Sequence, residues 1–176
     1  QLALMTAEIA AEGVRPKPRI IGLGPDVPDD DVPPDLNMDP EILARMKAGM
    51  YGVTSEAGGT ALRSGDLGLG GPRLAGKTGT AQVRRISAEE RRTGILKGDD
   101  IARRLRDHAL FVAYAPHDDP KYAISVIVEH GEGGSKAAAP VARDILAHAL
   151  RIDARRAPIY TRTAAVSGAS NASGGP

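Results

Sequence analysis

Two apolar segments separated by a very short turn place the strongest constraint on the fold of this chain. The segments are residues 108–115 (HALFVAYA) and 121–129 (KYAISVIVE), and the turn between them reads PHDDP. A connection this short joins antiparallel neighbours, so the pattern predicts a β-hairpin. In the second segment the apolar side chains alternate with a period of two, so that Ile127 lies on one face. The opposite face is predicted to carry Tyr122, Ile124, Val126 and Val128.

Three other segments have the apolar spacing of helices. They are residues 1–13, a segment that begins at Asp39-Pro40 and ends at Gly52, and residues 137–152. Asp at the cap and Pro at the first helical position favour the start of the second helix. The expected apolar stripes are Leu2, Met5 and Ile9 in the first helix, Ile42, Leu43, Met46 and Met50 in the second, and Val141, Ile145, Ala149 and Ile152 in the third. We expect the third stripe to pack on the sheet.

Residues 73–84 (RLAGKTGTAQVR) predict a further strand preceded by a tight glycine turn. The expected fold class is therefore α/β (α+β), with three antiparallel strands that contain Lys77–Arg84, His108–Ala115 and Tyr122–Glu129. The last helix is expected to cross one face of this sheet. Residues 87–107 are charged and only patchily helical, and Ser87-Ala88-Glu89-Glu90 predicts a capping box.

Composition excludes several classes of function. The chain has no Cys, which excludes disulfide scaffolds, thiol catalysis and Cys-based zinc sites. A net charge of +1 gives no bulk electrostatic argument for nucleic acid, and no nucleic-acid partner is expected. With only 3% aromatic residues, the core must come from aliphatic side chains.

The chain reads as a piece of a longer protein, because it begins at Gln1 inside a helical pattern that has no capping residue. No run of residues approaches the ~18 apolar residues that a membrane span needs. We expect residues 1–163 to form part of one domain, interrupted by an acidic, Pro-rich connector at residues 22–38. The small and polar residues 164–176 are expected to form a disordered tail.

Lys77-Thr78-Gly79-Thr80 is the motif that carries chemistry. Lys77 supplies a fixed cation, and the two Thr hydroxyls can donate hydrogen bonds to a carboxylate. Gly79 has no Cβ and therefore lets a substrate backbone approach the strand. If the strand edge borders the site, the N–H of Thr80 would face a developing oxyanion. A surface strand with a solvated Lys is the alternative for a motif this short.

K-T-G is one of three signatures of serine acyltransferases and β-lactamases that recognise penicillin, the others being S-x-x-K and S-x-N. Five segments in the expected order make the resemblance specific. The chain resembles the class B penicillin-binding proteins, in particular the penicillin-binding protein 2 type, over roughly residues 1 to 151. The segments are QLALMTAEIA, LARMKAGMYGVT with the following GGTA, AGKTGTAQV, IARRLRDHALFVAYAP, and YAISVIVEHGEGGSKAAAPVARDIL.

The resemblance implies the C-terminal part of a serine transpeptidase or β-lactamase-like fold, and a parent protein with D,D-transpeptidase activity on peptidoglycan stem peptides. It implies that Lys77 supplies electrostatics and assists a proton relay, and that Thr78, Gly79 and Thr80 bind the substrate, with the amide of Thr80 completing an oxyanion hole. β-Lactams would acylate the same enzyme. No metal or organic cofactor is implied. The implied setting is a periplasmic domain anchored in the bacterial inner membrane by an upstream helix, with elongation-complex membrane proteins, including a glycosyltransferase, as partners.

The nucleophile is missing from this chain. No Ser has Lys three positions later, and there is no Ser-x-Asn. We therefore expect the chain by itself to be inactive and to form one wall of a site. Two other interpretations stay open: a non-catalytic binding fragment, and a serine β-lactamase or D,D-carboxypeptidase, which would share K-T-G but not the GMYGV and GGTA segments.

Other chemically capable residues are expected to be structural or solvated. The four histidines match no zinc-binding spacing. The basic residues near the motif are expected to form a solvated face, and these are Arg84, Arg85, Arg91 and Arg92. Gly131-Glu132-Gly133-Gly134 is expected to be a turn rather than a phosphate-binding loop.

Overall fold

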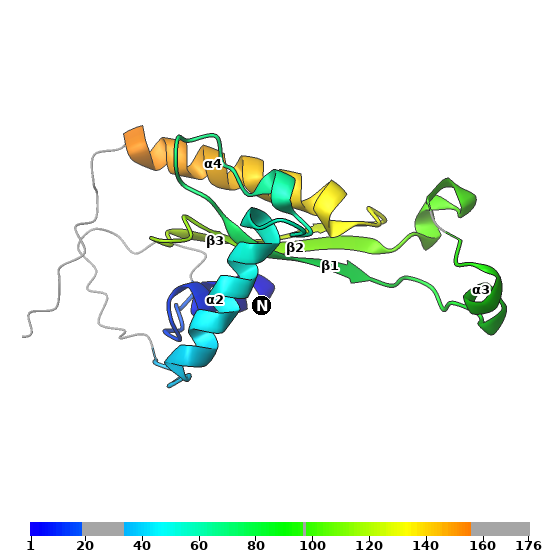
Figure 1. The fold of residues 1–176 in the computed structure, drawn as a ribbon, viewed down its shortest axis with the longest axis horizontal. Helices are drawn as coiled ribbons and strands as arrows, with labels where there is room; N and C mark the ends of the chain where they lie inside the picture. The colour runs from blue at the N-terminus through cyan, green and yellow to red at the C-terminus, as the bar shows by residue number, and fades with distance from the viewer. Residues whose placement is uncertain (19–33, 97, 156–176) are drawn as a thin grey trace, which may run out of the picture.

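The computed structural model describes residues 1–18, 34–96 and 98–155. A three-stranded antiparallel sheet forms its centre, with strand order β1-β2-β3. Helix α4 covers one face of the sheet, and α1 and α2 lie on the other (Figure 1). The expected fold class is confirmed.

The strands are β1 (Ala75–Ala81), β2 (His108–Ala115) and β3 (Tyr122–Val128). The β2–β3 hairpin matches the prediction, with Ala115 opposite Tyr122 beside the turn. The predicted first strand is shortened at both ends, since only residues 75–81 pair with β2. The outer edge of β1 has no strand partner among the residues described.

Two apolar clusters hold the layers together. On the α4 face, Phe111 is fully buried among the side chains of β2, β3 and α4. On the other face, Tyr114 is fully buried with Ile9 and Met50 from α1 and α2. Residues 111 and 114 are an odd number of positions apart, so their side chains point to opposite faces of β2. This one strand therefore supplies the largest buried side chain of each cluster.

Helix α1 (Leu2–Ala10) ends before the limit of the predicted segment 1–13 and is followed by a turn in which Gly13 has a φ of +93°. The expected stripe is only partly buried. Ile9 lies in the core, whereas Leu2 and Met5 are exposed. The buried face instead includes Thr6, whose hydroxyl donates to the carbonyl of Leu2.

Helix α2 (Pro40–Ser55) begins as predicted, with the carboxylate of Asp39 accepting a hydrogen bond from the N–H of Glu41. The prediction that Gly52 ends it is wrong. The helix continues for another turn because Glu56, not Gly52, adopts the extended backbone that stops it. Leu43 and Met50 from the expected stripe are buried, and Ile42 and Met46 are exposed.

Helix α4 (Ala139–Arg155) follows a π-helical turn at Gly134–Ala138. The stripe expected to pack on the sheet does not do so, since Val141, Ile145 and Ile152 are exposed. Three alanines and two leucines face the sheet instead, and the alanines let the helix approach the bulky strand residues closely. The buried residues are Ala139, Ala142, Leu146, Ala147 and Leu150.

The remaining short elements are η1 (Leu62–Ser64), α3 (Ala88–Thr93), η2 (Gly98–Asp100) and η3 (Arg103–Leu105). The last three belong to the connection between β1 and β2, residues 82–107, which we call the arm. The arm extends beyond the end of the sheet (Figure 1). None of the helices described has both the length and the apolar character needed to cross a membrane. The predicted tail and most of the predicted acidic connector lie outside the described residues.

Candidate functional site

Lys77, Thr78, Gly79 and Thr80 lie in the middle of β1, with one edge of the strand bonded to β2. Thr78 is paired with Phe111, which points toward α4. The side chains of Thr78 and Thr80 therefore share the α4 face, whereas Lys77 projects to the opposite face. The motif thus presents hydroxyls and a cation from the two faces of one strand, beside an edge that other groups can approach.

Lys77 is exposed, and its Nζ donates a hydrogen bond to the carbonyl of Thr78 at 2.8 Å. Within the described part of the chain, its ammonium forms no ion pair with an acidic side chain. The charge is therefore available to an anion placed near the strand.

Thr60 is a site residue that sequence reasoning did not select. Its Oγ1 lies 3.1 Å from Oγ1 of Thr78, so the two hydroxyls form a hydrogen bond. Thr60 belongs to the GGTA segment, which follows α2 and turns toward β1. The GGTA segment is part of the family pattern, but nothing in the sequence indicates that Thr60 contacts the motif directly.

The hydroxyl of Thr80 is exposed and donates to the carbonyl of Glu132 over 3.4 Å. Glu132 lies in the glycine turn, residues 131–134, which precedes α4. This long hydrogen bond is weak. The Thr80 hydroxyl can therefore exchange it for a stronger acceptor at little cost.

A cavity of about 670 Å³ extends from Thr80 between the glycine turn and the arm. Its polar lining includes Thr80, Ser135 and Lys136. Ile95 and Leu96 contribute apolar walls, although both side chains remain more than 40% exposed. The lining also includes Arg84, Asp107 and Glu132, so the cavity combines polar groups of both charge signs with apolar walls.

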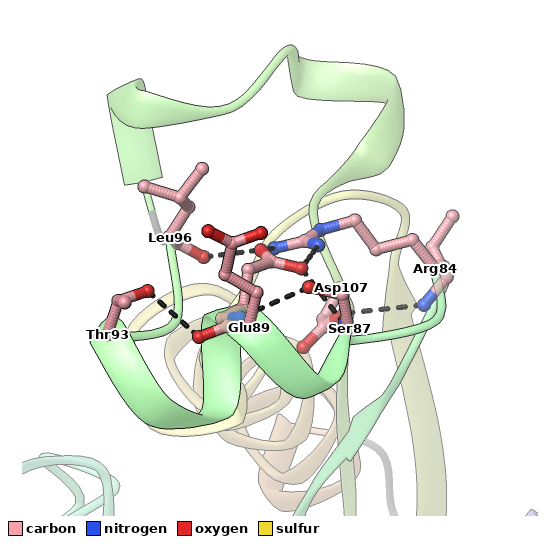
Figure 2. Close-up of polar contacts among 8 residues, drawn as sticks. Arg84, Ser87, Glu89, Thr93, Leu96 and Asp107 are labelled. Carbon is pink, nitrogen blue, oxygen red and sulfur yellow. Dashed lines mark hydrogen bonds and ion pairs between the residues drawn. The ribbon is translucent and has the colours of Figure 1, made fainter.

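The arm is held by an ion pair between Arg84 and Glu90 (Figure 2). Nη1 of Arg84 donates a hydrogen bond to Oε2 of Glu90 at 2.9 Å, and Nη2 lies 2.7 Å from Oε1 without hydrogen-bond geometry, so the contact is one hydrogen bond within an ion pair. The predicted capping box is confirmed, because Ser87 and Glu90 exchange side-chain and backbone hydrogen bonds. The hydrogen bond from Arg84, and next that from the backbone N–H of Ser87, lower the pKa of Glu90 to about 2.

Arg84 therefore does not belong to a solvated basic face, contrary to expectation. Its side chain is only 19% exposed, and Nη2 also donates to the carbonyl of Leu96 at 3.4 Å. The guanidinium thus connects the start of the arm to the residues that line the cavity. Arg85, Arg91 and Arg92 are exposed, as predicted.

Two further contacts hold the arm in place. The N–H of Val83 donates to the carboxylate of Asp107 at 3.3 Å, which joins the two ends of the arm (Figure 2). The N–H of Gly98 donates to the carboxylate of Glu132 at 2.7 Å, which joins the arm to the glycine turn. The position of the cavity walls is therefore coupled to the residues that surround Thr80.

Three of the four histidines have structural contacts. The backbone N–H of His130 donates to Nδ1 of His108 at 2.9 Å. His117 stacks on Tyr51 with ring centroids 4.3 Å apart, and its Nδ1 lies 3.0 Å from the hydroxyl of Tyr114. Burial lowers the pKa of His117, and the charge of Lys47 lowers it further. His148 is exposed on α4.

This fold and motif define a segment of a penicillin-recognising acyltransferase domain, and comparison with known families gives the same result. The penicillin-binding protein transpeptidase domain model matches residues 1–147. The chain belongs to this family. The predicted glycine turn and the motif strand both lie within the matched region.

Several of the related proteins are of the penicillin-binding protein 2 type, as the sequence segments indicated. The peptidoglycan D,D-transpeptidase MrdA of Haemophilus influenzae is 42% identical over 120 residues, which cover 66% of this chain and 17% of that protein. The chain thus spans less than a fifth of that relative.

Solved structures are similar over a larger share of the chain. Penicillin-binding protein 2 of Helicobacter pylori, in a complex with MreC, has 30% identity and a TM-score of 0.62 over 85% of this chain and 24% of its own. Penicillin-binding protein A of Mycobacterium tuberculosis, as an imipenem acyl-enzyme complex, has 26% identity and a TM-score of 0.56 over 84% of this chain and 29% of its own.

Proposed function

We propose that this chain forms one wall of the active site of a peptidoglycan D,D-transpeptidase that works through a serine acyl-enzyme. The serine is supplied from outside this chain, since no S-x-x-K occurs in it. Its oxygen attacks the carbonyl carbon of the penultimate D-Ala of a stem peptide, and the terminal D-Ala leaves with a proton. The amine of a neighbouring stem peptide then takes the acyl group and releases the serine.

In this proposal the motif stabilises the negative charges of the substrate and of the reaction. The substrate carboxylate binds to the hydroxyls of Thr78 and Thr80, and the ammonium of Lys77, on the other face of the strand, supplies a favourable positive charge. The N–H of Thr80 stabilises the oxyanion, and Lys77 also favours loss of the serine proton. Gly79 keeps the strand accessible to the substrate backbone. Each role needs a group fixed before reaction, and a β-strand supplies that preorganisation.

The observation that carries the proposal is the position of an ammonium and two hydroxyls in the middle of a strand; among the described residues the ammonium has no acidic partner and the outer edge of the strand has no strand partner. The Thr60–Thr78 hydrogen bond and the adjacent cavity add support. The imipenem acyl-enzyme of the Mycobacterium tuberculosis relative supports β-lactam acylation as a property of the parent protein.

The same proposal includes a setting and partners. We propose a periplasmic domain anchored in the inner membrane that acts with elongation-complex membrane proteins. The Helicobacter pylori relative, which was solved with MreC, supports a partner of that kind. A glycosyltransferase partner is proposed from the family resemblance alone. The proposed reaction needs no cofactor.

Acylation by a fluorescent penicillin tests the function. The intact protein should give a labelled band on a denaturing gel, and prior incubation with unlabelled β-lactam should abolish it. The 176-residue chain alone should give no band. A protein that folds normally but is never labelled would overturn the proposed chemistry.

A further inference from the structure

Glu132 connects the motif strand, the glycine turn and the arm. Its carbonyl oxygen accepts a hydrogen bond from Oγ1 of Thr80 at 3.4 Å, and its carboxylate accepts one from the N–H of Gly98 at 2.7 Å. Its own N–H donates to the carbonyl of Asp107 at 2.8 Å, where the arm returns to β2. A single residue of the turn therefore bonds to the motif and to two places in the arm.

The backbone at Glu132 needs these contacts. Its φ is +64°, and that of His130 is +57°, so two residues of this segment lie in the left-handed region. A Cβ makes that region unfavourable, and such a conformation persists only where surrounding contacts hold it. The N–H of His130 is held by Nδ1 of His108, and Glu132 is held by Gly98 and Asp107. The conformation of the turn therefore depends on contacts with the arm.

The hydrogen bonds that Glu132 accepts differ in strength. The carboxylate binds the N–H of Gly98 through a short, charge-assisted hydrogen bond, and Nε of Arg106 lies 3.9 Å from the same oxygen. The bond from Thr80 to the carbonyl is long and weak. A substrate carboxylate can therefore take over the hydroxyl of Thr80 while the bond between Glu132 and the arm stays in place.

We propose that Glu132 is a positioning residue for carboxylate recognition: by holding the glycine turn to the arm, it directs the hydroxyl of Thr80 toward the substrate. This role rests on the proposed function, because it requires Thr80 to bind the carboxylate. Glu132 acts through Thr80 and contacts neither the substrate nor the reacting atoms. All of its contacts described above are with residues of this chain, so the role requires no surface to be uncovered in the intact protein.

A direct effect of Glu132 on the ligand would have the opposite sign. Glu132 lines the cavity beside Thr80, and a carboxylate there repels a second carboxylate. If that repulsion dominated, Glu132→Ala and Glu132→Gln would both strengthen binding of an anionic ligand. A positioning role predicts instead that Glu132→Ala weakens such binding, whereas Glu132→Gln, which keeps an acceptor oxygen for Gly98, largely preserves it.

Acylation of the intact protein by benzylpenicillin and by its methyl ester tests the proposal. The ester lacks the carboxylate charge, so the ratio of the two apparent affinities measures carboxylate recognition. Glu132→Ala should lower this ratio about fivefold, a size typical of coupling between contacting residues, with little change in the maximal rate. Glu132→Gln should retain most of the ratio. In a Thr80→Val background, Glu132→Ala should lower the ratio no further.

Amide exchange at Gly98 gives a second measurement that does not depend on activity. It should be about tenfold faster in Glu132→Ala, because a hydrogen bond to a charged group is lost, and much less affected in Glu132→Gln. Glu129→Ala is the matched control, since it removes an exposed carboxylate three residues earlier and should change neither measurement. If Glu132→Ala does not fold, Glu132→Gly removes the same carboxylate and tolerates the positive φ, and it should lower the ratio similarly.

The outcomes separate this role from the proposed function. If Thr80→Val lowers the ratio and Glu132→Ala does not, or if Glu132→Ala lowers it equally with and without the Thr80 hydroxyl, the positioning role is wrong and the proposed function stands. A higher ratio in both Glu132→Ala and Glu132→Gln would likewise overturn it in favour of direct repulsion. If Thr80→Val itself leaves the ratio unchanged, or the protein is never acylated, the proposed function fails.

Discussion

Gly134 lies against the backbone of Gly79, so that a β-carbon on Gly134 would be 2.9 Å from the carbonyl oxygen of Gly79 and 3.1 Å from its nitrogen. The same β-carbon would be 2.3 Å from the carbonyl oxygen of Leu110. The turn that precedes α4 therefore rests directly on the motif strand and its partner, and the position of one fixes that of the other.

Gly134→Ala should destabilise the protein and slow acylation together. The new methyl group meets rigid backbone, so β1 must shift, and overpacking of this kind costs about 1–3 kcal/mol. Thermal unfolding and penicillin acylation rates measure the two effects. Gly133→Ala is the matched control, because a β-carbon there has no neighbour within 4 Å. Equal behaviour of the two variants would show that the turn does not support the motif.

In the full-length parent protein, Lys77→Ala should slow acylation by a β-lactam about a hundredfold with little change in stability. Loss of one well-placed charge or donor at a reacting centre costs ~3 kcal/mol in the transition state. The side chain of Lys77 is exposed, so its removal should change the free energy of unfolding little. Second-order acylation rates check this, with Lys121→Ala as the control for removing an exposed Lys. An unchanged rate in Lys77→Ala would remove the support for its proposed role.

Thr80→Val should weaken recognition of a carboxylate while leaving its amide in place. A hydrogen bond to a charged group contributes about 1.5–3 kcal/mol, so the apparent affinity for the β-lactam should fall at least about tenfold. The maximal rate of acylation should change much less. Thr93→Val, whose hydroxyl bonds Glu89 within α3, should alter neither quantity. A large fall in the maximal rate alone would contradict this division of roles.

Glu90→Gln should loosen the arm at neutral pH. The pKa of Glu90 is lowered from 4.5 to about 2 by its bonds with Arg84 and Ser87, so its ionised form favours the folded arm. This contribution is complete above pH 4.5 and is lost as the pH falls toward 2. Amide exchange in residues 84–96, corrected for intrinsic rates and compared with β2, should increase over that range. Glu90→Gln should show faster exchange at pH 7 and a flatter pH dependence, whereas the neighbouring Glu89→Gln should resemble the wild type.

The hairpin and the motif strand were predictable because their patterns are local. Alternation over β3 correctly separated Ile127, which is exposed, from the face that packs on α4. The face of α4 that packs on the sheet was not predictable from hydrophobicity, because Val141 and Ile145 are more hydrophobic than the alanines that are buried. Packing depends on how closely a helix can approach a sheet that already carries Phe111, and small residues permit the closer approach.

The site was only partly visible in the sequence for the same reason. The four motif residues were located correctly on a strand, but their proposed roles rest on the family resemblance. The contact of Thr60 with Thr78 joins segments that only the tertiary fold brings together. From the sequence, Arg84 is one of several arginines expected to be solvated. The sequence does not show that the capped helix α3 brings Glu90 into contact with Arg84.

The length of the arm has a consequence for how the sheet assembles. β2 and β3 are joined by residues 116–121, whereas β1 reaches β2 only across residues 82–107. The hairpin therefore closes at the lower entropic cost, and the motif strand is expected to join a partner that is already formed. Since each doubling of a flexible connection adds only about 0.6 kcal/mol, the arm can gain or lose residues during evolution while the strand that it follows keeps its register.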